Sequence, residues 1–267
     1  MPTARYKTTI NAPFHRLAEL LADKVEKPRK YVGAVMHSRI LEHGDGYVIR
    51  EMFQPIPVPL TIREKIYETD VPGGRDYIFE HIDNARYTGL FHNFLTRVEG
   101  REDQVELEYF MDWRPLPGVP DELSPEAAQR LVRNGVEHMK DIAENPVDVP
   151  DWVRTFFDAV DSMKAEALEP LLAEDCHFRV GNNAEVVGRD NVVEASRGVT
   201  KVFSAMQHDY VEVYGTEDRA YADCFVDYTS VSGERYLIPF LTRLERKDGK
   251  ITSVAAYGDL SPVRHGW

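Results

Sequence analysis

Apolar side chains recur at helical spacing in the segment that follows residue 122 and form one long stripe. The stripe consists of Leu123, Ala127, Leu131, Val132, Val136, Met139 and Ala143. Ser124 is a candidate N-cap, Pro125 suits the first helical position, and Glu126 favours the positive end of a helix. We therefore predict one long amphipathic helix whose apolar side packs on another element.

Before this helix the pattern changes to the alternation that is typical of strands. Strands are expected at about 6–11, 36–43, 46–53, 60–69, 75–83, 86–98 and 103–113, and short helices at about 13–23 and 28–35. A long amphipathic helix that closes a curved antiparallel sheet encloses a cavity. We therefore expect a ligand pocket in this half of the chain.

The stretch 144–150 contains two prolines and no periodicity, which is typical of a linker. Beyond it, helices are expected at about 151–161, 164–173 and 190–204. Strands are expected at about 176–180, 207–214, 219–230, 235–246 and 250–259, with turns at Ser232–Gly233 and Asp248–Gly249. The pattern predicts an α+β protein with two domains, 1–145 and 150–263.

The composition narrows the classes of partner. The 267 residues carry a formal net charge of -13, which argues against nucleic acid or an anionic membrane surface as the main partner. No apolar run approaches the roughly 18 residues of a membrane span, and the N-terminus lacks an apolar signal core. The two cysteines, Cys176 and Cys224, cannot form a disulfide framework. We expect a cytoplasmic protein.

Motifs for metals and common cofactors are absent from the sequence. The nine histidines are scattered, without a helical pair of metal-ligand spacing. Neither a P-loop nor a glycine-rich dinucleotide fingerprint is found. We therefore expect no metal site and no cofactor.

Several short segments of the second half carry a family resemblance through their order and spacing. They are 171–175, 188–190, His208, Tyr228–Thr229, Gly233, 248–251 and 257–262. Together they resemble the SnoaL-like branch of the NTF2-like superfamily over about 150–263. The resemblance implies a cone of helices against a curved sheet around an apolar pocket. This superfamily includes polyketide cyclases, ketosteroid isomerase, scytalone dehydratase and limonene epoxide hydrolase, and also non-catalytic binding and dimerising modules.

The first half has a less specific resemblance, carried by 27–35, by Arg50–Glu51 and by Arg63–Glu64. These residues are similar to the SRPBCC superfamily, which has the START and Bet v 1 helix-grip fold, and most of all to its AtaL-like branch. The implied fold has a deep hydrophobic cavity, used across the superfamily for lipids, polyketides and aromatic ligands.

Asp259 is the first candidate catalytic residue. Counting by twos from Ile251 places Ser253, Ala255, Tyr257 and Asp259 on one strand face. In the SnoaL-like pattern the Asp of the last strand acts as the general base, and an apolar pocket would raise the pKa of its carboxyl. The alternative is a solvated Asp that starts the turn at 260–262.

His208 is the second candidate, as an auxiliary acid that stabilises an enolate or returns a proton. The alternative is a core histidine bonded to backbone. Tyr210 shares its strand face, and Tyr210 and Tyr257 are expected to contact ligand. The stretch 180–183 lacks the carboxylate base of ketosteroid isomerase, and the apolar strand 236–241 lacks the Arg and Asp of the epoxide hydrolase. Those two reactions are disfavoured.

Glu51 and Glu64 form a separate candidate site in the first half. Each lies on an otherwise apolar strand face. A hairpin around 55–59 with Phe53 opposite Ile62 would set the two carboxylates opposite each other, where they repel unless a proton or cation is shared. They would then anchor a ligand. The alternatives are pairing with a neighbouring Arg, such as Arg97, or a register that differs by one.

The leading hypothesis is a cofactor-independent cyclase, dehydratase or isomerase that acts by acid and base catalysis on a hydrophobic polyketide-like or aromatic small molecule. Asp259 would be the base and His208 the auxiliary acid. The rival hypothesis is a non-catalytic binding or carrier protein, because fold does not determine function. A third is that one half is catalytic and the other serves dimerisation or substrate capture. The NTF2-like sheet often pairs across a two-fold axis, so a homodimer is expected.

Overall fold

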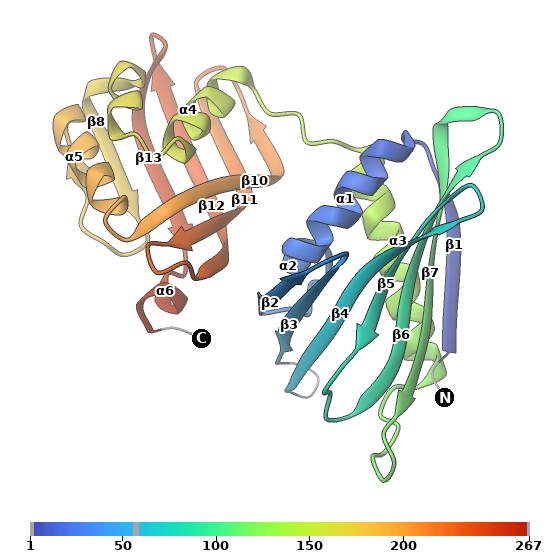
Figure 1. Ribbon diagram of the computed structural model, residues 1–267. Coiled ribbons are helices and arrows are strands. Elements are labelled where there is room, and N and C mark those ends of the chain that lie inside the picture. The colour runs from blue at the N-terminus through green and yellow to red at the C-terminus, as the bar shows by residue number, and fades with distance from the viewer. Residues whose placement is uncertain (1–2, 56–58, 266–267) are drawn as a thin grey trace. The chain divides into compact units, whose positions relative to one another are not determined.

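The computed structural model describes residues 3–55 and 59–265, and the chain divides into two compact units between Pro146 and Val147. Each unit is a sheet with helices packed on it (Figure 1). Within the described ranges, no helix combines the length and apolar character needed to cross a membrane.

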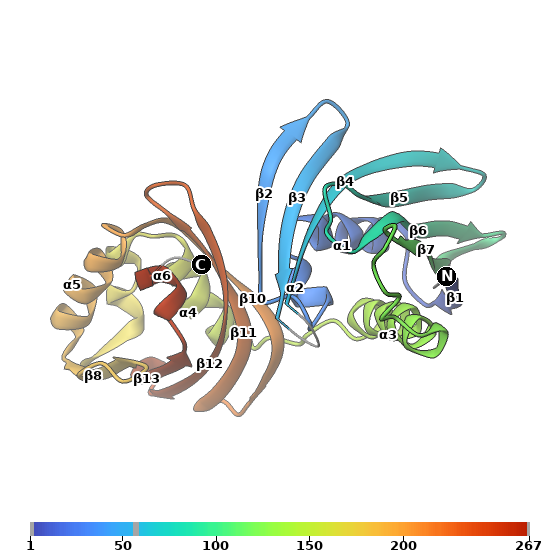
Figure 2. The same ribbon diagram turned by 90° about the horizontal axis from the view of Figure 1, so that it is seen from below.

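The N-terminal unit is largely sheet. Its elements are β1 (Thr3–Ile10), α1 (Phe14–Glu26), α2 (Pro28–Tyr31), β2 (His37–Gly44), β3 (Tyr47–Gln54), β4 (Leu60–Val71), β5 (Gly74–His81), β6 (Tyr87–Val98), β7 (Arg101–Pro115) and α3 (Pro125–Glu144). The seven antiparallel strands lie in the order β1-β7-β6-β5-β4-β3-β2. The sheet curls around α1 (Figure 2). The helix-grip assignment of this unit stays a prediction.

The long helix α3 has the apolar side that the sequence predicts. It packs on β1 and β7 through the buried residues Ala128, Val132, Val136, Met139 and Ala143. The Oγ of Ser124 accepts a hydrogen bond from the backbone N–H of Ala127 at 3.2 Å, which confirms the N-cap. Leu131 was expected in the stripe, but it is exposed because the buried residues follow a narrower line along the helix.

The register between β3 and β4 differs by one residue from the expected pairing. The five-residue connection joins Gln54 and Leu60, which lie opposite each other, and its residues 56–58 lie outside the described part of the chain. Glu51 therefore faces Arg63, and Glu64 faces Arg50. Because a shift of one residue reverses the face on which a side chain lies, the two carboxylates point to opposite sides of the sheet. The expected proton-sharing pair of Glu51 and Glu64 is wrong.

The C-terminal unit begins with helices and ends in a sheet. Its elements are α4 (Asp151–Asp161), the 3-10 helices η1 (Ala165–Ala167) and η2 (Glu169–Leu171), β8 (Leu172–Val180), β9 (Val186–Val187), α5 (Arg189–Val199), β10 (Phe203–Gly215), β11 (Arg219–Ser230), β12 (Arg235–Lys247), β13 (Lys250–Gly258) and α6 (Ser261–His265). The strand order is β10-β11-β12-β13-β8-β9, in which the β13–β8 pair is parallel and the other neighbouring strands pair antiparallel. α4 and α5 lie over one face of this sheet (Figure 1).

An irregularity in β13 decides which of its residues face the interior. Arg246 faces Ile251 and Glu245 faces Ser253, so Thr252 is an extra residue. Such a β-bulge moves every later side chain to the opposite face. Ile251 and Val254 are consequently both core residues. Counting in twos from Ile251 therefore gives the wrong face beyond the bulge. Ser253, Ala255 and Tyr257, predicted on the same face as Ile251, lie on the outer face.

Candidate active site

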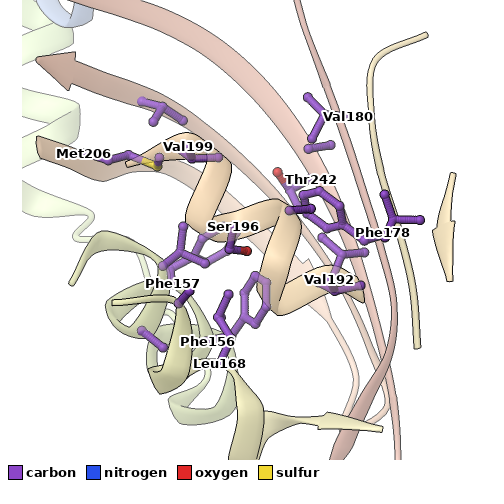
Figure 3. A pocket seen from close by; sticks show the side chains of 18 of the residues that line it. Phe156, Phe157, Leu168, Phe178, Val180, Val192, Ser196, Val199, Met206 and Thr242 are labelled. Atoms are coloured by element: carbon purple, nitrogen blue, oxygen red, sulfur yellow. The ribbon is translucent and has the colours of Figure 1, made fainter. Parts of the chain in front are cut away.

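An apolar cavity of about 380 Å³ lies in the C-terminal unit. Its walls come from α4, η1 and α5 on one side and from the inner face of β8 and β10–β13 on the other. Figure 3 shows the aromatic and aliphatic side chains that surround it. The apolar lining includes Phe156, Phe157, Leu168, Phe178, Val180, Val192, Val199, Met206, Val226 and Phe240. Such a cavity has the size and character of a small-molecule site.

His208 lines this cavity and is paired with Asp161. The imidazole Nδ1 lies 2.5 Å from Oδ1 of Asp161, and the backbone N–H of His208 donates to Oδ2 at 2.8 Å. A carboxylate only accepts hydrogen bonds, so the hydrogen of a neutral imidazole resides on Nδ1. Within residues 3–55 and 59–265, the hydrogen bonds of His208 involve its backbone N–H and Nδ1, and none involves Nε2. That nitrogen therefore keeps a lone pair that can accept a proton from a ligand.

The end of α4 positions the pair of His208 and Asp161, which we call the dyad. The helix buries Val153, Phe156 and Phe157, and its last residue is Asp161. A carboxylate is disfavoured at the negative end of a helix, and here the two N–H donors of His208 offset that cost. The ring of Phe157 lies 4.4 Å from the imidazole, between centroids, and restricts its orientation.

Met163 closes the turn after this helix in a left-handed conformation, with φ of 55°. This conformation is uncommon for a residue with a branched or long side chain and is usually taken by glycine at helix ends. Met163 also lines the cavity. The Met163 side chain thus forms part of the cavity wall, although glycine would adopt this backbone conformation at a lower energetic cost.

Besides His208, the polar residues of the lining include Lys164, Arg179, Asn183 and Thr200, and three further hydroxyl groups. These three hydroxyl groups belong to Tyr228 on β11, Thr242 on β12 and Ser196 on α5. Burial raises the pKa of Tyr228, so its phenol keeps its proton and can donate a hydrogen bond. On the neighbouring strand His208 faces Val226, two residues from Tyr228, so the imidazole and the phenol lie on the same inner face.

Asp259, the predicted base, lies outside the cavity. It is exposed, and it accepts hydrogen bonds from the backbone N–H and the Oγ of Ser261, at 2.8 and 2.9 Å. These bonds lower the pKa of its carboxyl, whereas an apolar pocket would have raised it. The prediction of Asp259 as a buried base is wrong. The residue accepts both bonds from the first residue of the short helix α6, and its neighbour Leu260 does line the cavity.

The two tyrosines expected to contact ligand also lie elsewhere. Tyr257 is 44% exposed on the outer face of β13, where its hydroxyl accepts a hydrogen bond from Arg179 at 3.0 Å. Tyr210 is half-buried and packs edge-on against Phe157, with ring centroids 5.8 Å apart. Among the described residues that line the cavity, neither tyrosine appears.

Asp161 was missed by the sequence reasoning, although a weak signal exists. It is an acidic residue in the last turn of a well-formed amphipathic helix, where the helix dipole disfavours it. A carboxylate in that position needs a hydrogen-bond donor or a positive charge to offset the helix dipole, and a histidine can supply either. The sequence alone does not show that this partner lies 47 residues away.

Residues 153–254 match the model of the SnoaL-like domain family, which supports a SnoaL-like domain in the C-terminal unit. The match does not extend to the N-terminal unit. A search of curated proteins gives no match to the chain.

Among solved structures, the chain is similar to a hypothetical protein of ketosteroid isomerase-like fold from Catenulispora acidiphila in complex with trimethylamine (19% identity, 43% of this chain, 91% of that chain, TM-score 0.41). It is also similar to a putative polyketide cyclase from Xanthomonas campestris (21%, 41%, 89%, TM-score 0.38). A third similar structure is an epoxide hydrolase of LEH-like type from M. tuberculosis (14%, 41%, 81%, TM-score 0.38).

Proposed function

We propose that the C-terminal cavity is the active site of an enzyme that moves a proton on an apolar small molecule carrying a carbonyl group. The supporting observation is the imidazole of His208, paired with Asp161, in the wall of a largely apolar cavity. The reaction class is isomerisation, ring closure or loss of water, without a cofactor. Asp259 has no part in it.

His208 serves as the general base. Its Nε2 accepts the proton from a carbon next to the carbonyl, the C–H bond breaks, and the electron pair moves onto the carbonyl oxygen as an enolate. Asp161 holds the ring orientation and stabilises the imidazolium that forms. The same Nε2–H then returns the proton to a different atom, which completes an isomerisation or allows a leaving hydroxyl to depart as water.

The enolate oxygen needs a hydrogen-bond donor, and the cavity offers neutral ones. Tyr228 is the best placed because it lies on the same inner face as His208 and retains its proton. A donor directed at developing charge in a cavity with little water contributes strongly to catalysis. Ser196 and Thr242 are positioned to hold a second polar group of the substrate.

The substrate class follows from the lining. Most of the wall is hydrocarbon or aromatic ring, and about 380 Å³ suits a compact aromatic or polyketide-like molecule. The family match supports the same direction, because the SnoaL-like resemblance implies polyketide cyclases among its members.

The apolar lining also fits a second function, the binding and transport of a hydrophobic ligand without turnover. The two functions are separated by incubating the protein with a panel of aromatic β-diketones and analysing the mixture by mass spectrometry. An enzyme gives a product that His208→Gln abolishes while ligand binding remains. Tight binding by both proteins with no product in either would reject the enzymatic proposal in favour of a carrier.

A further inference from the structure

The N-terminal unit contains a buried group of polar side chains that the proposed reaction does not use. Lys24 of α1 is 7% exposed, and its Nζ donates to Oδ1 of Asn93 at 2.8 Å and to the hydroxyl of Tyr109 at 3.1 Å. The same ammonium lies over the rings of Phe79, Phe91 and Tyr109, at 5.2, 5.6 and 4.2 Å from their centroids. The ammonium thus lies against these three aromatic rings, which we call the aromatic floor, between α1 and the sheet.

Arg50 brings a second buried cation to the same floor. It is 2% exposed, and its guanidinium lies 5.5 Å from the centroid of Phe79. One nitrogen donates to the carbonyls of Lys24 and Val25 at the end of α1, and another donates to Oε2 of Glu64 at 2.6 Å. Glu64 thus pairs with Arg50 and also acts on the Lys24 amine through its charge. Lys24, Arg50 and Glu64 together carry one positive charge in excess whenever the Lys24 amine is protonated, and a buried charge without a partner is strongly disfavoured.

His81 and Trp113, which lie next to the aromatic floor, add buried nitrogens without hydrogen-bond partners among the described residues. Glu64 faces Arg50 on one side and His81 on the other, and the rings of His81 and Trp113 lie 4.5 Å apart between centroids. The imidazole Nε2 lies 4.0 Å from Oε1 of Glu64 and the ring approaches the backbone of Tyr87, but neither of its nitrogens reaches hydrogen-bond geometry. Trp113 Nε1 is also buried without a partner in the described part of the chain.

The unpartnered atoms share one chemical character. Within residues 3–55 and 59–265, the buried nitrogens without a hydrogen bond in this cluster are Arg50 Nε, Asn93 Nδ2, Trp113 Nε1 and both nitrogens of His81. The first three can only donate, and a neutral imidazole supplies one donor more. Buried polar groups in native proteins nearly always have partners, so each orphan needs an explanation. An excess of donors and of positive charge calls for a molecule that is rich in acceptors and negatively charged.

We propose that the interior of the N-terminal unit, between α1 and the sheet, binds a small organic carboxylate. Lys24 and Arg50 supply the charge, and Asn93, His81 and Trp113 supply donors. Within the aromatic floor, Phe79 and Phe91 face each other across β5 and β6. Their rings favour a carboxylate that is attached to a flat apolar body.

A proton is taken up when the carboxylate binds. Burial, and secondarily the charge of Arg50, lower the pKa of Lys24 to about 7, while Glu64 opposes that shift. The other groups around the cluster are the imidazole of His81, whose pKa burial lowers, and the phenol of Tyr109, whose pKa burial raises. A bound anion favours the charged amine, so affinity falls as the pH rises above about 7 and binding at pH 8 draws a proton from the buffer.

Isothermal titration of the full chain with benzoate tests this site. Benzyl alcohol, which has the same ring without the charge, is the matched ligand. We expect benzoate to bind at pH 6.5, benzyl alcohol to bind at least tenfold more weakly, and the heat at pH 8 to depend on the ionisation enthalpy of the buffer. Equal affinities for the two ligands, a heat independent of buffer, or no benzoate binding at all would overturn the proposal.

Variants assign the binding to the cluster. Lys24→Met should weaken benzoate binding at least tenfold and abolish proton uptake, whereas Lys65→Met, on the opposite face of the same sheet, should change neither. Glu64→Gln should tighten binding severalfold because it removes the competing negative charge. Val199→Phe, which narrows the C-terminal cavity, should leave benzoate binding intact; loss of binding in this variant would assign the ligand to the other unit and contradict the proposal.

Discussion

Asp161 and His208 lie 47 residues apart in the sequence, yet the carboxylate of the first meets the imidazole of the second at 2.5 Å at the wall of an apolar cavity. The end of α4 supplies the carboxylate and β10 supplies the imidazole. In the proposed mechanism this pair, and not an acidic side chain of the last strand, carries out the proton transfer.

Replacing Asp161 by Asn should lower kcat/KM by at least about 100-fold, because the amide no longer stabilises the imidazolium or selects the Nδ1–H tautomer. Asp158 lies on the exposed side of the same helix, so Asp158→Asn is the matched control. Steady-state kinetics with circular dichroism of both variants is the measurement. Equal activity in the two variants would remove Asp161 from the mechanism.

Asp259→Asn should leave turnover close to that of the unsubstituted protein. Its carboxylate accepts hydrogen bonds from Ser261 at the start of α6, and asparagine makes a comparable cap. The same kinetic assay checks this expectation. A loss of activity as large as that of the Asp161 variant, in a folded protein, would restore Asp259 as the base.

Ser124→Ala should lower the free energy of unfolding of the N-terminal unit by about 1 kcal/mol, because α3 loses the acceptor for the Ala127 N–H. Urea denaturation followed by circular dichroism measures the change. Ser124→Asp keeps an acceptor at the cap and should retain the stability. If the Ala and Asp variants were equally destabilised, the cap would not be the cause.

The stability of the N-terminal unit should rise with pH above neutrality. Lys24 has a pKa of about 7 in the folded protein, against about 10.4 for an unfolded lysine. Between these values the unfolded chain binds more protons than the folded one, so the free energy of unfolding increases with pH. Lys24→Met should flatten this dependence in denaturation curves recorded from pH 7 to 10. An unchanged slope in the variant would show that the amine is not the group that titrates.

Most of the secondary structure was accessible from the sequence because periodicity and caps are local properties. The apolar stripe and cap of α3 agree with the sequence prediction, and so do the bounds of β11 and, nearly, those of β12. The segment 164–173 failed as a helix: it forms two 3-10 turns, and Leu172 already begins β8.

The site was harder to predict because it depends on register and on long-range packing. One extra residue, Thr252, reverses the face of β13 and moves Tyr257 to the outside. One residue of register in the β3–β4 hairpin separates Glu51 from Glu64. His208 was identified through the family resemblance, whereas its partner Asp161 becomes visible only when α4 is packed on β10.

The most direct test of the central claim is the exchange of solvent deuterium into an enolisable aromatic ketone bound by the protein, followed by proton NMR. The account predicts that the unsubstituted protein catalyses exchange at the carbon next to the carbonyl and that His208→Gln loses at least about 100-fold of this rate while still binding the ketone. Exchange at the same rate in both proteins would contradict the assignment of His208 as the base.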